Sequence, residues 1–103
     1  MKIAILGSTR YKSEIEQYVR DIEGEQIRVR TATFDSKNLS ELETCKRNRD
    51  VIEWADEVRF MWDGQSMGVV FDFGVCFALR KKVKMIYENK RTFSNLFKQM
   101  EEE

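Results

Sequence analysis

Residues 58–87 read VRFMWDGQSMGVVFDFGVCFALRKKVKMIY, and this stretch decides the fold. Short runs at 58–62 and 83–87, apolar except for Arg59 and Lys84, enclose a longer run at 69–79 that is apolar almost all round. A short apolar run is typical of a strand buried on both faces, whereas the longer run has the length of a deeply buried helix. Residues 63–68, with two glycines, form the loop before that helix. The stretch therefore predicts one strand–helix–strand unit of a parallel sheet.

The segments before this stretch repeat the alternation. Ile3–Leu6 is another short apolar run, and Gly7 closes it. The apolar residues of Ser13–Ile22 recur at helical spacing, so we expect a helix there. Gln26–Phe34 alternates in the manner of a half-exposed strand, which predicts a strand at an edge of the sheet.

Serine residues mark the start of two further helices. Ser40 and Glu43 form a capping box, which predicts a helix running to about Trp54. Ser94 is expected to cap a final helix. The residues expected to point inward from the first of these helices are Leu39, Leu42, Cys45, Val51, Ile52 and Trp54, and those from the second are Leu96, Phe97 and Met100.

Strands and helices thus alternate along the whole chain. This pattern predicts a single α/β domain over residues 1–103, Rossmann-like and specifically flavodoxin-like, with helices on both faces of a parallel sheet of about four strands. The expected strand order is 2-1-3-4. Ligands of such sheets bind at the carboxyl ends of the strands, where the strand order reverses, which here is between strands 1 and 3.

The composition limits the classes of function. Lys plus Arg and Asp plus Glu each number 18, and this balance disfavours a protein that binds nucleic acid by neutralising phosphates. The absence of histidine removes the usual zinc ligand and general base, so we expect no metal site and no cofactor. The two cysteines lack metal spacing and are expected to be reduced thiols in a cytoplasmic protein. The opening apolar run, Ile3–Leu6, is too short for a signal peptide core or a membrane span.

Two loops are expected to meet at the carboxyl edge of the sheet. The first contains Gly7, Ser8, Thr9 and Arg10, which offer close backbone approach, two hydroxyls, N–H groups at a helix start and a guanidinium for phosphate. A tight turn with a surface arginine is the alternative. The second loop runs from Asp63 through Gly64 and Ser66 to Gly68, and its residues are candidates for contacting the same ligand.

Asp72 interrupts the apolar helix at what the sequence suggests is its first turn. A carboxylate there gains from the helix dipole, so simple capping is one interpretation. Gly74 leaves open space one turn away, and a partly buried carboxylate facing a cleft is the other interpretation: a nucleophile or ligand anchor.

Two further features have two interpretations each. Trp62 ends the third strand, where it either stacks on a base or belongs to the core. Arg47 to Asp50 is a polar cluster within the second predicted helix, and a solvated helix face is the simpler interpretation. The alternative is that one turn of it faces the crevice, where Asp50 or Asn48 would hold ligand hydroxyls.

The stretch Ser66–Gly74, followed by Ala78 and Lys82-Val83, resembles the nucleoside 2-deoxyribosyltransferase family, which includes the deoxynucleoside-monophosphate N-glycosidases. The opening Gly7-Ser8-x-Arg10 is similar to that of the N-glycosidases. The segments 47–50, 55–56 and 62–68 are equally similar to the SLOG superfamily of nucleotide-ligand sensors.

The first resemblance implies cleavage or transfer of the N-glycosidic bond of a deoxynucleoside or its 5′-monophosphate. It implies that Asp72 is the nucleophile, that Asp50 orients the substrate, and that Ser66 and the Gly7-Ser8 turn hold a 5′-phosphate. It also implies a homodimer or a higher oligomer. Asp72 is one methylene shorter than the glutamate of the family, and Ile3–Leu6 lacks the tyrosine often found there. The second resemblance implies a domain that binds a nucleotide-derived ligand without turnover.

Overall fold

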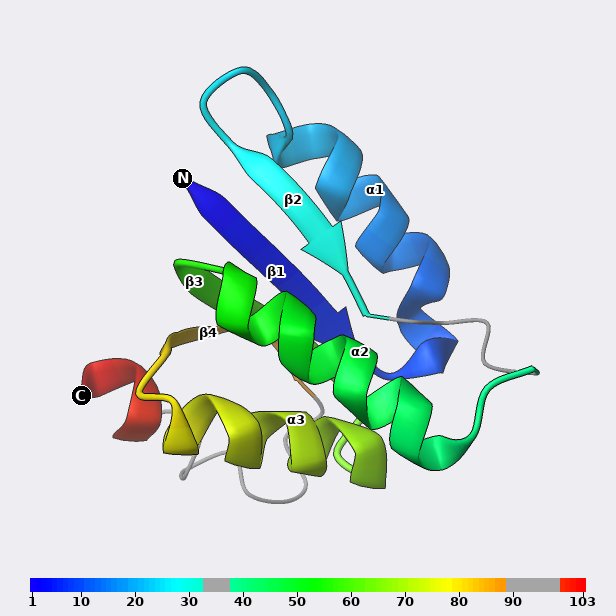
Figure 1. The fold of residues 1–103 in the computed structure, drawn as a ribbon. Helices are drawn as coiled ribbons and strands as arrows, with labels where there is room; N and C mark the ends of the chain where they lie inside the picture. Colours follow the sequence, from blue (N-terminus) through cyan, green and yellow to red (C-terminus); the bar gives the residue numbers. More distant parts are fainter. Residues whose placement is uncertain (33–37, 89–98) are drawn as a thin grey trace.

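The computed structural model describes residues 1–32, 38–88 and 99–103, and its centre is a parallel sheet of four strands (Figure 1). The strand order is β2-β1-β3-β4, which confirms the predicted topology. The strands are β1 (Lys2–Gly7), β2 (Arg28–Thr31), β3 (Glu57–Trp62) and β4 (Lys82–Glu88). The helices are η1 (Thr9–Tyr11, a 3-10 turn), α1 (Lys12–Ile22), α2 (Glu41–Trp54) and α3 (Met67–Ala78).

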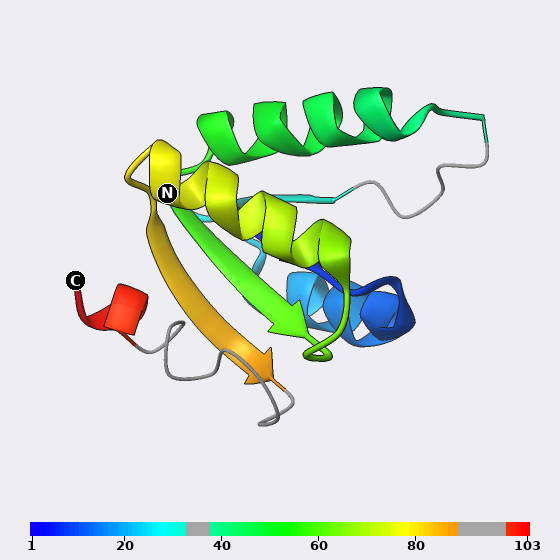
Figure 2. The same cartoon turned by 90° about the horizontal axis from the view of Figure 1, so that it is seen from below.

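Helices cover both faces of the sheet, as expected. Figure 2 shows α2 and α3 together on one side, and α1 packs on the other. The residues of β1 explain why two layers are needed. Ile3 and Ile5 are buried against α1, while Ala4 and Leu6 are buried in the cluster under α2 and α3. A central strand that is apolar on both faces requires cover on both sides.

The edge position predicted for the second strand is confirmed. Among the described strands, β2 pairs with β1 alone, in parallel, from Arg28 beside Lys2 to Thr31 beside Ile5. Its side chains alternate between exposed and half-buried positions. Residues Thr33 and Phe34 of the predicted strand lie outside the described residues. The expected Ser94 cap, Leu96 and Phe97 also lie outside them.

The start of α2 follows its capping signal. Ser40 Oγ accepts a hydrogen bond of 3.1 Å from the backbone N–H of Glu43. The inward face of this helix was partly wrong: Leu42 is 64% exposed, and the buried residues are Asn48 and Ile52. Asn48 and Ile52 are four residues apart and share a face, from which Leu42 is rotated away.

Two predictions about α3 are also wrong. The helix starts at Met67, so Met67 and Gly68 belong to its first turn and not to the preceding loop. The helix is not deeply buried, because Phe71 and Phe77 lie on a side that no other described element covers. One side of α3 packs on the sheet and on α2. The opposite side stays exposed because a chain of this size has little further structure with which to cover it.

Gly7 is required by a close approach between β1 and β3. A Cβ at this position would clash with the carbonyl oxygen of Met61 and would lie 2.9 Å from Ile15 Cδ1. The next residue, Ser8, donates its backbone N–H to the same Met61 oxygen at 3.0 Å. The glycine therefore serves the packing of the sheet against α1.

We expect Gly7→Ala to lower the free energy of unfolding by about 1–3 kcal/mol, because a backbone oxygen on one side of the new methyl group cannot move aside easily. Gly74→Ala is the matched control. A Cβ there meets no atom within 4 Å, so this change in a helix should stabilise the fold by about 1 kcal/mol. Urea unfolding of both variants measures the difference. Equal stabilities would contradict this account of Gly7.

Candidate functional site

The carboxyl ends of β1 and β3 bring the two predicted loops into contact. The backbone N–H of Asp63 donates to Ser8 Oγ at 3.2 Å, and Ser66 Oγ lies 2.9 Å from the same oxygen. Ser8 is buried although it is a serine. Three polar groups from two strand ends therefore form one cluster, as the strand order led us to expect.

Asp63 organises the loop between β3 and α3. Its Oδ1 accepts hydrogen bonds of 2.9 Å from the backbone N–H groups of both Gln65 and Ser66. Gly64 takes a φ of 82°, which lets the chain turn between them. Burial raises the pKa of Asp63, but hydrogen bonds from the two N–H groups and from the hydroxyls of Ser66 and Ser8 outweigh it and hold the pKa below its ordinary value. Asp63 is therefore an ionised structural acceptor.

The cluster lies at the start of α3. Ser66 is the N-cap residue, and its hydroxyl makes no capping bond to the helix because it is directed at Ser8 and Asp63. The first backbone N–H groups of any helix lack partners within the helix and favour an anion. Two serine hydroxyls beside such a helix start are a suitable environment for a phosphate group.

Asp72 lies in the second turn of α3, between that helix and α2. The prediction that it occupies the first turn is wrong, because the helix starts at Met67, and capping therefore does not explain it. Its side chain is 5% exposed, and the Nδ2 of Asn48 donates to its Oδ2 at 3.5 Å. The open space at Gly74 is on the opposite, exposed side of the helix, not beside this carboxylate.

Burial has a large effect on this acid. Desolvation raises the pKa of Asp72 from 3.8 to about 7, and the hydrogen bond from Asn48 opposes this only in part. One turn further on, burial and the neighbouring Asp72 charge raise the pKa of Cys76 to about 12, so Cys76 is a neutral core thiol. Asp72, with a pKa of about 7, gains and loses its proton near neutral pH.

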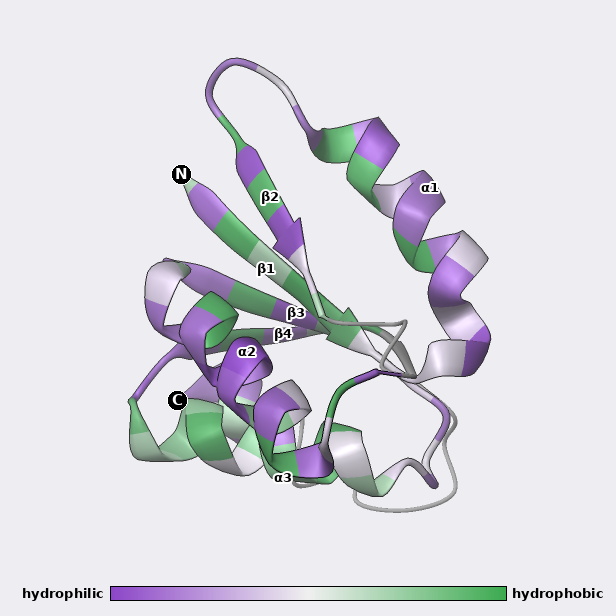
Figure 3. Ribbon diagram, turned by 45° about the vertical axis from the view of Figure 1, so that its right-hand side comes forward, coloured by the Kyte–Doolittle hydropathy of each residue, from purple (hydrophilic) through white to green (hydrophobic). Residues whose placement is uncertain are grey.

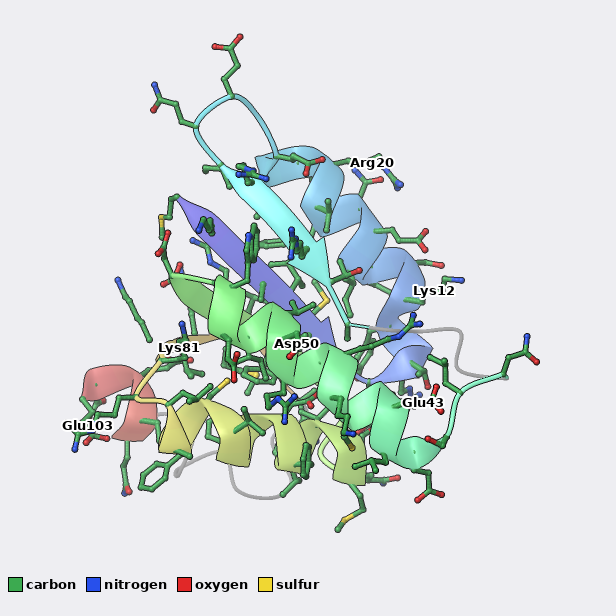
Figure 4. All side chains as sticks on the ribbon, in the orientation of Figure 1. Lys12, Arg20, Glu43, Asp50, Lys81 and Glu103 are labelled. Carbon is green, nitrogen blue, oxygen red and sulfur yellow. The ribbon has the colours of Figure 1, made fainter. Side chains whose placement is uncertain are left out.

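The structure does not bring all of the candidate residues to this place. The side chain of Asp50 is 68% exposed, and its Oδ1 lies 3.5 Å from Nη2 of Arg49 (Figure 4). Asn48, two positions earlier, points inward, and residues two apart on a helix do not share a face. Trp62 is 1% exposed and belongs to the core under α2 and α3.

The remaining candidates lie around the cluster. Thr9 and Arg10 are exposed on η1, and the Arg10 guanidinium lies 5.7 Å from the centre of the Tyr11 ring. Gly68 is in the first turn of α3, with no atom within 4 Å of the position of a Cβ. These three residues border the start of α3 or of α1, where a ligand would contact backbone N–H groups.

Sequence reasoning named Asn48 and Asp72 separately but did not pair them. A usable signal existed, because Asn48 falls between Cys45 and Ile52 on the inward side of α2, at spacings of three and four. A polar residue in such a row requires a polar partner from the facing helix. Asp72 is the polar residue that α3 offers.

Two other kinds of feature are absent from the described parts of the chain. Within residues 1–32, 38–88 and 99–103, no three His, Cys, Asp or Glu side chains are grouped so that they would hold a metal ion. No helix in those same ranges combines the length and apolar character needed to cross a bilayer.

The raised pKa of Asp72 predicts how stability depends on pH. The folded state keeps this proton when the unfolded state has lost it, so the free energy of unfolding falls as pH rises from about 4 to about 7, by about 4 kcal/mol in total. Asp72→Asn removes this loss of stability at higher pH, because the amide of asparagine has no proton to lose in this range. We expect urea unfolding to show that the variant gains stability relative to the natural chain as pH rises to about 8.

Asp63→Asn is the matched control, because the pKa of Asp63 is lowered. Its carboxylate stabilises the fold above its unfolded pKa, and that contribution is lost as pH falls through the folded pKa. We expect this variant to be weaker than the natural chain at neutral pH, with the difference shrinking in acid. If the free energy of unfolding of Asp72→Asn changed with pH in the same way as that of the natural chain, the raised pKa assigned to the buried Asp72 would be contradicted.

Comparisons with protein-family models, with curated proteins and with solved structures find no match for this chain. The resemblances noted in the sequence stay predictions, and the function has to be inferred from the geometry of the site.

Proposed function

We propose that this chain binds a deoxynucleoside 5′-monophosphate at the carboxyl edge of β1 and β3 and cleaves or transfers its N-glycosidic bond. The observation that supports this most directly is that one helix, α3, carries both parts of the required chemistry. Its start lies beside the hydroxyls of Ser8 and Ser66, and its second turn carries the buried acid Asp72.

The spacing along α3 fits such a substrate. Met67 opens the helix and Asp72 follows five residues later, which is roughly 8 Å along the axis at the usual rise per residue. A phosphate held at the helix start would leave the sugar extending along the helix toward the carboxylate. The phosphate would accept hydrogen bonds from the first backbone N–H groups of α3 and from Ser8 and Ser66, whose hydroxyl protons would turn from Asp63 to the phosphate, with Arg10 at the outer side.

Asp72 would act as the nucleophile. Its carboxylate attacks the anomeric carbon, the bond to the base nitrogen breaks, and the electron pair leaves with the base, which takes up a proton. Water then hydrolyses the glycosyl ester and regenerates the acid. A carboxylate in a site of low polarity stabilises the positive charge that develops on the sugar. Asn48, which donates to Asp72, would hold the attacking group in orientation.

A second candidate function is binding without turnover, as in a nucleotide-sensing domain. The raised pKa of Asp72 favours it, since an acid with a pKa of about 7 is half neutral at physiological pH. A neutral carboxyl group donates a hydrogen bond to a sugar hydroxyl, and it attacks poorly. The protonation state of Asp72 in the complex therefore separates the two functions.

Incubation with a panel of deoxynucleoside monophosphates tests the enzyme. We expect chromatography to detect free base, at a rate that rises with pH and levels off above about 7, because the nucleophile must be ionised. Asp72→Asn should lower the rate on the order of 100-fold or more. Asp21→Asn, an exposed change on α1, is the control and should keep the rate. Base release that survives Asp72→Asn would exclude the mechanism.

Calorimetry with the same panel tests binding alone. The sensor function predicts affinity with intact nucleotide recovered afterwards, and it predicts that Asp72→Asn keeps the affinity because an amide also donates a hydrogen bond. Ser8→Ala and Ser66→Ala should each weaken binding about tenfold under either function, since each removes one hydroxyl from the phosphate. Undiminished affinity in both serine variants would place the ligand elsewhere.

A further inference from the structure

One edge of the described sheet presents backbone groups that β1 does not use. β2 ends the strand order, and no described strand lies beyond it. The backbone N–H groups of Arg28 and Ala32 donate to β1 at 2.9 and 3.2 Å. Because backbone groups alternate between the two sides of a strand, the N–H and C=O groups of Val29 and Thr31 point away from β1. Among the described residues, these four groups form an open edge to which another strand can pair.

Three cations line one face of this edge. The Arg30 guanidinium lies 4.4 Å from the centre of the Trp54 ring, so its side chain is on the α2 face of the sheet. Arg28, two residues earlier, shares that face, and Lys2 lies beside Arg28 in the register, with its Nζ 5.8 Å from the same ring. We call Lys2, Arg28 and Arg30 the β2 cation row. Figure 3 shows the alternation of hydrophilic and hydrophobic residues along β2.

The nearby acids of the described chain leave this charge unpaired. Asp50 and Glu53 lie 3.5 and 3.9 Å from Arg49, on α2 itself. Asp56 accepts a hydrogen bond of 2.9 Å from the backbone N–H of Lys2, not from its ammonium group. Within the described residues no ion pair joins an acid to the β2 cation row. The other exposed charges on the turn before β2 and on the adjoining helix sides are of both signs: Lys12, Glu16, Glu23, Glu25, Glu43 and Arg47.

The opposite face of the edge is apolar. Val29 packs with the cluster under α1, and so do Ile27, Val19 and Ile22, all of them only partly buried. A strand added beside β2 would set alternate side chains against the cations on one face and against this cluster on the other, because side chains that face each other across a strand pair lie on the same face.

We propose that β2 binds an extended segment of a partner protein as an additional strand, with acidic side chains at alternate positions and apolar side chains between them. The backbone of the segment would pair with Val29 and Thr31, and its carboxylates would face the β2 cation row. Trp54 holds the Arg30 guanidinium by stacking, which leaves the N–H edge of that group available to a carboxylate. None of these residues belongs to the cluster of Ser8, Asp63 and Ser66, so this surface is separate from the proposed nucleotide site.

The charge pattern disfavours two other occupants. A second copy of β2, paired antiparallel through the same edge, would set arginines of one chain against arginines of the other on the same face. A nucleic acid strand would satisfy the cations, but its phosphates only accept hydrogen bonds, and the outward carbonyl groups of Val29 and Thr31 need donors. The alternating backbone N–H groups of a peptide supply those donors.

Fluorescence anisotropy with a labelled hexapeptide of alternating glutamate and valine tests the proposal. We expect binding to the natural chain, and binding at least about tenfold weaker for the same peptide with lysine in place of glutamate. Arg28→Glu combined with Arg30→Glu should reverse this preference, so that the lysine peptide binds more tightly than the glutamate peptide. A gain of binding does not arise from a chain that fails to fold.

Arg20→Glu combined with Lys46→Glu is the matched control, because it makes the same change in net charge at exposed positions on α1 and α2. This variant should keep the preference for the glutamate peptide. A glutamate peptide that does not bind the natural chain, or a preference that Arg28→Glu with Arg30→Glu leaves unchanged, would overturn the proposal. So would tighter binding of a single-stranded oligonucleotide than of the glutamate peptide.

Methylation of the peptide backbone tests strand pairing without any change to the protein. Methyl groups on the nitrogens of the glutamates alone, or of the valines alone, remove the N–H donors from one side of the extended peptide. We expect one of these two peptides to lose binding at least about tenfold and the other to keep it, since only one side faces β2. Equal affinity of the two methylated peptides would show that the cations bind acids without an added strand, and would overturn the proposal.

Discussion

The close contact between β1 and β3 is the constraint on which the rest of the structure depends. The two strands are adjacent, parallel and buried, and at Gly7 the backbone of one comes so near the backbone of the other that a side chain has no room. Because the strands are parallel, their carboxyl ends finish at the same edge. Ser8 and Asp63 are the residues that follow, and they meet as a direct consequence.

The same arrangement fixes the position of α3. The turn around Asp63 aligns the start of the helix with Ser8, and the helix then runs back over the sheet beside α2. Asp72 is carried into the space between the two helices, where its side chain is almost fully buried and the amide of Asn48 donates to its Oδ2. Strand packing thereby determines both the polar cluster and the environment that changes the acidity of a residue more than a turn away.

Much of the fold could be predicted from the sequence, because alternation of short apolar runs with helical periodicity leaves few topologies for four parallel strands. The start of α3 could not, because Gly68 suggested a loop although glycine is tolerated in a first helical turn. The burial of α3 was overestimated for a different reason. An apolar helix face has the same sequence pattern whether its own domain or another molecule covers it.

The residues of the candidate site could be predicted from the sequence, but the pairing of Asn48 with Asp72 was missed. Ser8, Asp63 and Ser66 follow strands whose order was predictable, so their meeting was predictable too. Choosing between Asn48 and Asp50 required the rotational phase of α2, which depends on tertiary contacts with Ile52 and not on local propensity. Whether the site holds a nucleotide, and what happens to it, is a property of chemistry that no periodicity encodes.

The buried acid gives this histidine-free chain a proton that is exchanged in the range usually reserved for imidazole. Any ligand that prefers one form of Asp72 must release that proton to the solvent or take one up as it docks. The heat of association would then vary with the ionisation enthalpy of the buffer, and buffers of different enthalpy would count the protons that accompany each bound molecule.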